Sequence, residues 1–132
     1  MEIGGVLIAA TTAWIFGALW YALWGGRWMA AAGLAEDQLS AKNPLPFVVS
    51  FLAAVLVAGM MRHIFAASGV EGLLPGALSG LGLGLFITAP WLVTNYVFAN
   101  RSFDLMWIDG GYAVGGCTVS CPGVALLAAK RR

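Results

Sequence analysis

Charged residues are scarce in this sequence. Asp, Glu, Lys and Arg make up 10% of its 132 residues, whereas hydrophobic residues make up 61%. A soluble domain carries roughly a quarter charged residues and about half apolar ones, so this chain has too little polar surface to enclose a water-soluble core. The composition therefore predicts an integral membrane protein.

The side chains that usually carry chemistry are also few. Histidine occurs once, at position 63, and cysteine twice, at positions 117 and 121. Both cysteines fall in an apolar run, where neither a disulfide framework nor a zinc site is expected, so we interpret them as packing residues. No His accompanies a nucleophile in a catalytic pattern, and no glycine-rich phosphate loop follows a strand. We expect no enzyme activity, no metal and no cofactor.

The net charge of +1 comes without a long basic run. Electrostatics therefore indicate neither a nucleic acid nor a strongly anionic partner. The expected surroundings are the lipid bilayer and other membrane protein subunits, or further copies of the chain.

Four long runs contain no Asp, Glu, Lys or Arg: residues 3–26, 43–61, 72–100 and 110–129. About 20 apolar residues in a helix cross a hydrocarbon layer of roughly 30 Å. We predict an all-α, multi-pass integral membrane protein, a four-helix transmembrane bundle that forms a single domain over 1–132. The expected helices cover about 3–24, 45–67, 73–98 and 105–129.

Glycine and proline suggest where these helices end or bend. Gly25 and Gly26 are expected to end the first helix. The mixed polar and apolar segment 27–43 then predicts a short helix lying in the membrane interface. Pro90 should kink the third helix, and Pro122 should interrupt the fourth, because proline removes a backbone hydrogen bond.

Aromatic residues gather where the first and third helices meet their loops. Tyrosine and tryptophan at such positions anchor a protein at the headgroup level. Four crossings place both termini on one side, but Lys and Arg are nearly balanced between the two sides, so the orientation stays open. The predicted interface aromatics are Trp20, Tyr21, Trp24, Trp28 and Trp107.

Each expected helix also carries a row of small side chains at four-residue spacing, of the GxxxG type. Helices associate in lipid by close backbone approach, which such rows permit. Either all rows meet inside one bundle, or at least one row, most plausibly the glycines of the third helix, faces another subunit. The rows are Gly5, Ala9, Ala13, Gly17; Ser50, Ala54, Ala58; Gly76, Gly80, Gly84, Thr88; and Ala113, Cys117, Cys121, Ala125.

Two polar residues lie inside the predicted membrane segments. Asn95 and Asp109 are equally far from the turn near Ser102, so both are expected at about the same depth, on the order of 10 Å below it. A carboxylate at the bilayer centre costs about 2.5 to 3.5 kcal/mol on insertion scales and requires partners. Candidate partners are Asn95, Tyr112, and Arg101 or Arg27 from the loops.

Two interpretations of Asp109 remain open at this stage. The carboxyl group either clips the fourth helix to its neighbours, or lines a polar cavity with Asn95 for a proton, a cation or a small ligand.

Several strings along the chain resemble a bacterial family of small four-helix integral membrane proteins, catalogued as a domain of unknown function. The resemblance implies the same fold and a bacterial inner membrane, and it implies no activity. The strings are Gly17–Tyr21, Arg27–Met29, Ala32–Leu34, Asn43–Pro44, Thr94–Tyr96, Arg101 and Ile108–Tyr112.

Two classes of function fit these observations. The first is a non-catalytic accessory or assembly subunit that docks on a larger membrane protein complex. The second is a small oligomeric transporter or channel with a polar site at Asn95 and Asp109.

Overall fold

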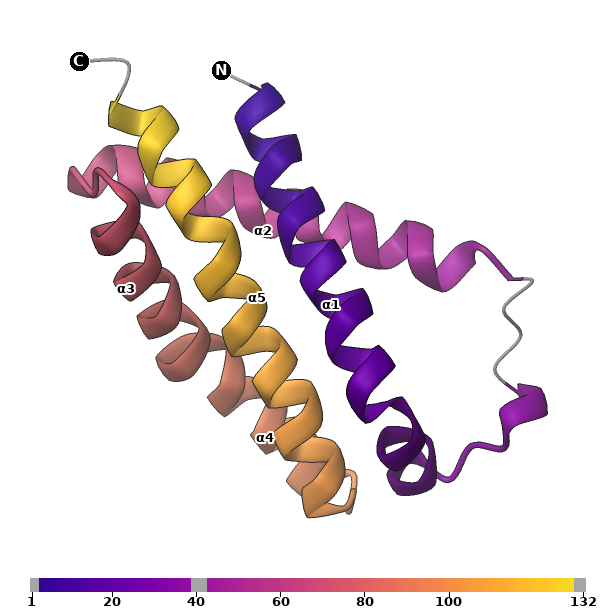
Figure 1. Ribbon diagram of the computed structural model, residues 1–132. Coiled ribbons are helices and arrows are strands. Elements are labelled where there is room, and N and C mark those ends of the chain that lie inside the picture. Colours follow the sequence, from indigo (N-terminus) through magenta and orange to yellow (C-terminus); the bar gives the residue numbers. More distant parts are fainter. Residues whose placement is uncertain (1–2, 39–42, 130–132) are drawn as a thin grey trace.

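The computed structural model describes residues 3–38 and 43–129, and it is helical with no strands over that part of the chain. Four long rods make up the fold (Figure 1). They are α1 (Ile3–Ala32), α2 (Leu45–Ser68), a continuous rod made of α3 (Leu73–Leu83), η2 (Gly84–Thr88) and α4 (Ala89–Phe98), and α5 (Phe103–Ala129).

Three of these rods are long and apolar enough to cross a membrane: α1, α2 and Leu73–Phe98. This is consistent with a membrane protein. Over the described residues α5 is less apolar, because Asp104, Asp109 and several glycines dilute its hydrophobic side chains. The predicted all-helical fold with four long helices is confirmed.

The least apolar helix lies at the centre of the molecule. α5 contacts α1, α2, α3 and α4. α1 and the α3–α4 rod run along α5, while α2 crosses obliquely over one face of α1 and α5 (Figure 1). α1 begins and α5 ends at the same end of the molecule (Figure 1).

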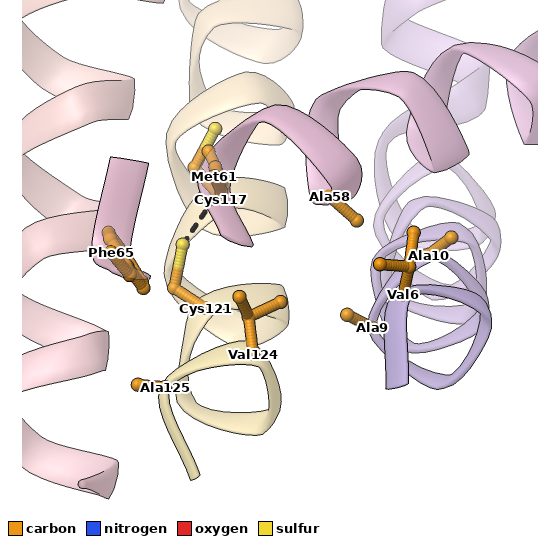
Figure 2. Packing of buried hydrophobic residues seen from close by; sticks show 10 residues of the cluster. All are labelled: Val6, Ala9, Ala10, Ala58, Met61, Phe65, Cys117, Cys121, Val124 and Ala125. Carbon is orange, nitrogen blue, oxygen red and sulfur yellow. Dashed lines mark hydrogen bonds between the residues drawn. The ribbon is translucent and has the colours of Figure 1, made fainter. Parts of the chain in front are cut away.

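The hydrophobic core lies where α2 crosses α1 and α5 (Figure 2). Small side chains let the helices approach closely there, and two larger residues, Met61 and Phe65, fill the remaining space. The Cys121 thiol donates a hydrogen bond to the Met61 sulfur at 3.0 Å. The other members are Val6, Ala9, Ala10, Ala58, Cys117, Val124 and Ala125.

The predicted end of the first helix at Gly25 and Gly26 is wrong. α1 continues to Ala32. Glycine inside a helix costs only about 1 kcal/mol relative to alanine, and continuing the helix lets Trp28 pack edge-on against Tyr21, with ring centroids 5.9 Å apart. The residue that ends α1 is Gly33, whose φ of 71° favours glycine.

The same capping motif ends three rods. Beyond Gly33, Gly69 and Asn100, the next amide donates to the carbonyl five residues earlier: Leu34 to Met29, Val70 to Phe65, and Arg101 to Tyr96. A left-handed residue followed by this bond is the Schellman motif, which satisfies carbonyls at a helix end.

No separate interfacial helix is present over the described part of the segment 27–43. Its first six residues belong to α1, and Glu36–Gln38 form a single 3-10 turn, η1. Residues 39–42 lie outside the described residues, so that part of the prediction falls beyond the structure.

The two prolines within helices act differently. Next to Pro90 the rod Leu73–Phe98 contains the π-helical segment η2, where the Ala89 amide donates to the Gly84 carbonyl. π-helical turns accommodate irregularities in the backbone ladder. The predicted interruption at Pro122 is wrong, because α5 passes through this residue as one helix, held by neighbours on several sides.

Candidate functional site

The glycine row of the rod Leu73–Phe98, in α3 and at the start of η2, lies directly against α5. A Cβ on Gly76 would come within 2.7 Å of the Ala125 side chain, and one on Gly84 within 2.7 Å of the Val114 backbone. A Cβ on Gly80 would meet the Cys117 carbonyl oxygen and the Cys121 side chain. Of the two arrangements left open, the structure has the one in which this row lies inside the bundle, since α5 of the same chain covers it.

Glycines and aromatic rings interlock between α1 and α5. A Cβ on Gly17 of α1 would come within 2.6 Å of the Tyr112 ring, and one on Gly111 of α5 within 2.6 Å of the Trp20 ring. Gly115 makes the same kind of room for Phe16. Gly5 is buried in α1. The missing side chains therefore let whole rings of one helix rest on the backbone of the other.

Asp109 is the buried carboxyl group of the molecule's described part, with 8% of its surface exposed. The Tyr21 hydroxyl of α1 donates to one of its oxygens. The Tyr96 hydroxyl of α4 donates to the other at 2.5 Å. Asp109 of α5 thus joins three helices, which is the clip predicted as one of its two possible roles.

The predicted partners of Asp109 are wrong. Asn95 is exposed on α4 and makes no hydrogen bond to it among the described residues. Adjacent helical residues are separated by about 100° around the axis, so equal depth does not place Asn95 on the face toward α5. Tyr96 is on that face, together with the half-buried Ala89 and Leu92.

The remaining candidate partners are engaged elsewhere or lie outside. Arg101 is exposed in the turn before α5. Tyr112 packs its ring against Tyr21, with centroids 5.3 Å apart. Arg27 forms an ion pair with Asp104 at 3.1 Å. Of the two tyrosines that hold Asp109, Tyr21 was predicted only as an interface aromatic, and Tyr96 was not predicted as a site residue.

The interface aromatics form a continuous contact between α1 and α5. Trp24 packs edge-on against Trp107, with ring centroids 4.8 Å apart, and Trp20 donates from its indole to the Ile108 carbonyl at 2.9 Å. The Arg27 guanidinium lies 5.4 Å from the centre of the Trp107 ring. The three tryptophans are half-buried and Arg27 is exposed, so the rings join α1 to α5 and the guanidinium covers them from outside.

Asp104 extends this contact from the first turn of α5, just before the predicted membrane span 105–129. It accepts hydrogen bonds from Arg27 and, at 3.2 Å, from the Trp107 indole. The hydrogen bonds from Arg27 and Trp107 hold the pKa of Asp104 below its ordinary value.

Three of the strings used in the sequence comparison meet at Asp109. Gly17–Tyr21 supplies Trp20 and Tyr21, Thr94–Tyr96 supplies Tyr96, and Ile108–Tyr112 supplies the carboxyl group with the glycines beside it. That both tyrosines belong to these strings was the signal in the sequence that could have revealed Tyr21 and Tyr96. Over the described residues no group of three His, Cys, Asp or Glu could hold a metal ion.

The fold and this site define an all-helical protein with three candidate membrane spans and a tyrosine-bound carboxyl group. Residues 5–124 match the family described as "Protein of unknown function (DUF1761)". Because the match covers most of the chain, the protein belongs to this family, and the predicted membership of a family of unknown function is confirmed. No curated protein and no solved structure matches the chain.

Proposed function

We propose that this protein is a non-catalytic accessory or assembly subunit that docks on a larger membrane complex. In this proposal all four rods cross a bacterial cytoplasmic membrane, with Glu36–Gln38 at its surface. The docking surface is the outer face of α4, defined here as Trp91, Asn95 and Phe98.

The observation that supports this surface most directly is the position of Asn95. Trp91, Asn95 and Phe98 are spaced four and three residues apart, so they share one helical face. Trp91 is 70% exposed and Phe98 is 89% exposed. None of the residues of α4 is buried. An amide on such an apolar face lacks water to bond with inside a bilayer, and amides there bond across to a neighbouring helix.

The occupant that we propose is a transmembrane helix of a different protein, with an acceptor or donor opposite Asn95. Around Asp109 the polar groups are already paired within the chain, since Asp109 holds two tyrosines and Trp20 bonds to Ile108. These groups are therefore suited to holding the helices together, whereas the exposed amide on α4 is left for recognition.

A small oligomeric transporter or channel is the alternative. It requires Asn95 and Asp109 in one lining. Asn95 is exposed on the outside of α4, whereas both oxygens of Asp109 are occupied inside the bundle. This geometry favours docking over transport through that pair.

Co-purification tests the proposal. The full chain is tagged, extracted in a mild detergent and analysed by mass spectrometry for stoichiometric foreign subunits. We expect Asn95→Leu to lose them. Thr94→Val is the matched control, because the exposed Thr94 hydroxyl bonds to the Pro90 carbonyl of its own helix at 2.9 Å, and we expect it to keep them. Equal retention by both variants, or a pure homo-oligomer, would contradict the proposal.

A further inference from the structure

A partly open cavity of about 670 Å³ lies between α1, α2 and α5. Its volume is within the range of about 300 to 1,000 Å³ that is usual for small-molecule sites. The docking surface on α4 contributes nothing to it, so the cavity is a separate feature of the fold.

The cavity forms because α2 leaves α1 after their crossing. The two helices touch at Val6, Ala9 and Ala58, and further along α1 the lining residues on the side of α2 are Pro46, Phe47 and Ser50. Tyr112 of α5 also lines the cavity. Small residues of α1 leave the space open: Gly17, Ala18 and Gly25.

Aromatic side chains at seven-residue spacing form the wall on α1: Trp14, Tyr21 and Trp28. The rise of 1.5 Å per residue makes the distance from Trp14 to Trp28 about 21 Å along the helix. The hydrocarbon chains of one bilayer leaflet occupy about 15 Å, which is half of the full thickness. The cavity is therefore long enough for one complete lipid chain.

Hydrogen bonding distinguishes the two ends of the cavity. At the deep end the Trp14 indole donates to Ser50 at 3.1 Å, so this donor is already paired. At the other end, one turn before the end of α1, the Trp28 indole nitrogen is buried and makes no hydrogen bond within the described residues. Because the Trp28 nitrogen is covered by protein atoms, the cavity presents rings and not donors to a ligand, which suits a hydrocarbon chain.

We propose that this cavity binds one acyl chain of a membrane glycerolipid. The chain extends along α1 between Phe47 and Tyr21, and its end lies near Trp14, Ser50 and Tyr112. The ester carbonyl of a lipid lies at the edge of the hydrocarbon layer, and Trp28, near the end of α1, is at a matching level. The apolar lining fits the methylene chain.

Two glycines of α1 give a matched pair of variants. Gly25 lines the cavity and Gly26 does not, and a Cβ would meet nothing within 4 Å at either position. Gly25→Phe should fill the cavity without disturbing the helix contacts, whereas Gly26→Phe should leave it open. Native mass spectrometry of the full chain in mild detergent, with lipid analysis of the extract, counts the bound molecules.

We expect about one glycerolipid per chain in the wild type and in Gly26→Phe, and at least tenfold less in Gly25→Phe. Equal lipid content in both glycine variants, no bound lipid in the wild type, or a bound isoprenoid quinone instead of a glycerolipid would overturn the proposal.

A measurement on the wild-type chain keeps the proposal testable if Gly25→Phe does not fold. A phospholipid with a photoreactive diazirine at the end of one acyl chain is incorporated and activated. We expect crosslinks at Trp14, Ser50 or Tyr112. Crosslinks confined to exposed outer residues such as Leu19 and Leu23, with none at the cavity, would overturn the assignment.

Discussion

Replacing Gly80 with alanine tests the contact between α3 and α5. A Cβ there would lie 2.7 Å from the Cys121 sulfur and 2.8 Å from its Cβ, and it would also collide with the Cys117 backbone oxygen. Ordinary van der Waals contact begins at 3.4 Å, so relieving the sulfur contact alone requires the two helices to separate by about 0.7 Å, and the closer Cys117 oxygen requires more. A backbone oxygen cannot rotate away as a flexible side chain can.

The magnitude follows from this separation. A gap of 0.5 to 1 Å forfeits roughly a quarter to a half of the dispersion attraction between facing atoms. Overpacking of this kind typically costs 1 to 3 kcal/mol, and we expect Gly80→Ala to lower the free energy of unfolding by about that amount. Gly80→Ile adds a larger, branched side chain and should abolish accumulation of the folded protein.

Gly82 of the same helix is the matched control, because a Cβ there meets nothing within 4 Å. Gly82→Ala should leave the free energy of unfolding unchanged or raise it by up to about 1 kcal/mol, since alanine favours the helix. Unfolding is followed by tryptophan fluorescence during titration of a mild detergent with dodecyl sulfate. Equal stability of Gly80→Ala and Gly82→Ala would refute the packing of α3 on α5.

Three further predictions concern the interior and the end of the bundle. Tyr21→Phe and Tyr96→Phe each remove one donor from Asp109 and should each lower the free energy of unfolding by about 1 to 2 kcal/mol, with non-additive effects in the double variant. Tyr112→Phe, whose hydroxyl makes no hydrogen bond among the described residues, should cost less than about 0.5 kcal/mol. Equal costs in all three variants would contradict the role of Asp109 in joining the helices. Because the pKa of Asp104 is lowered in the folded state, its contribution to the free energy of unfolding is present above the unfolded-state pKa of about 3.9 and is lost as the pH falls through the folded-state pKa. The wild type should therefore lose more stability than Asp104→Asn between pH 6 and pH 3. Parallel curves of stability against pH would argue against the ion pair with Arg27. Cys117 and Cys121, 6% and 0% exposed, should react with a maleimide only after unfolding, and rapid labelling of the folded protein would contradict their burial.

The fold follows from signals that lie along the sequence. Charge-free runs reveal the long helices because hydrocarbon tolerates no charge, and the helix 73–98 has the predicted bounds in the structure. The end of α1 was misjudged because two glycines suggested a stop at Gly25. Glycine ends a helix when the backbone turns left-handed, as it does at Gly33, and the residue type alone does not show which glycine does so.

The site was predicted less completely because it depends on rotation about the helix axes. Counting residues from a turn gives the depth of Asp109 but not the direction of its neighbours. The exposed Asn95 is followed directly by Tyr96, which bonds to Asp109. The cavity could not be predicted from composition, because it results from the oblique crossing of α2 and from side chains of three helices.

The central proposal is that all four rods, three of which are candidate membrane spans, cross a bilayer. Single cysteines at Asp37, Ser68 and Ser102, all exposed, are introduced into a chain that carries Cys117→Ala and Cys121→Ala. They are labelled with a membrane-impermeant maleimide in right-side-out and inverted vesicles. Positions 37 and 102 should react from one side only, and position 68 only from the other. Labelling of all three from the same side would contradict the account.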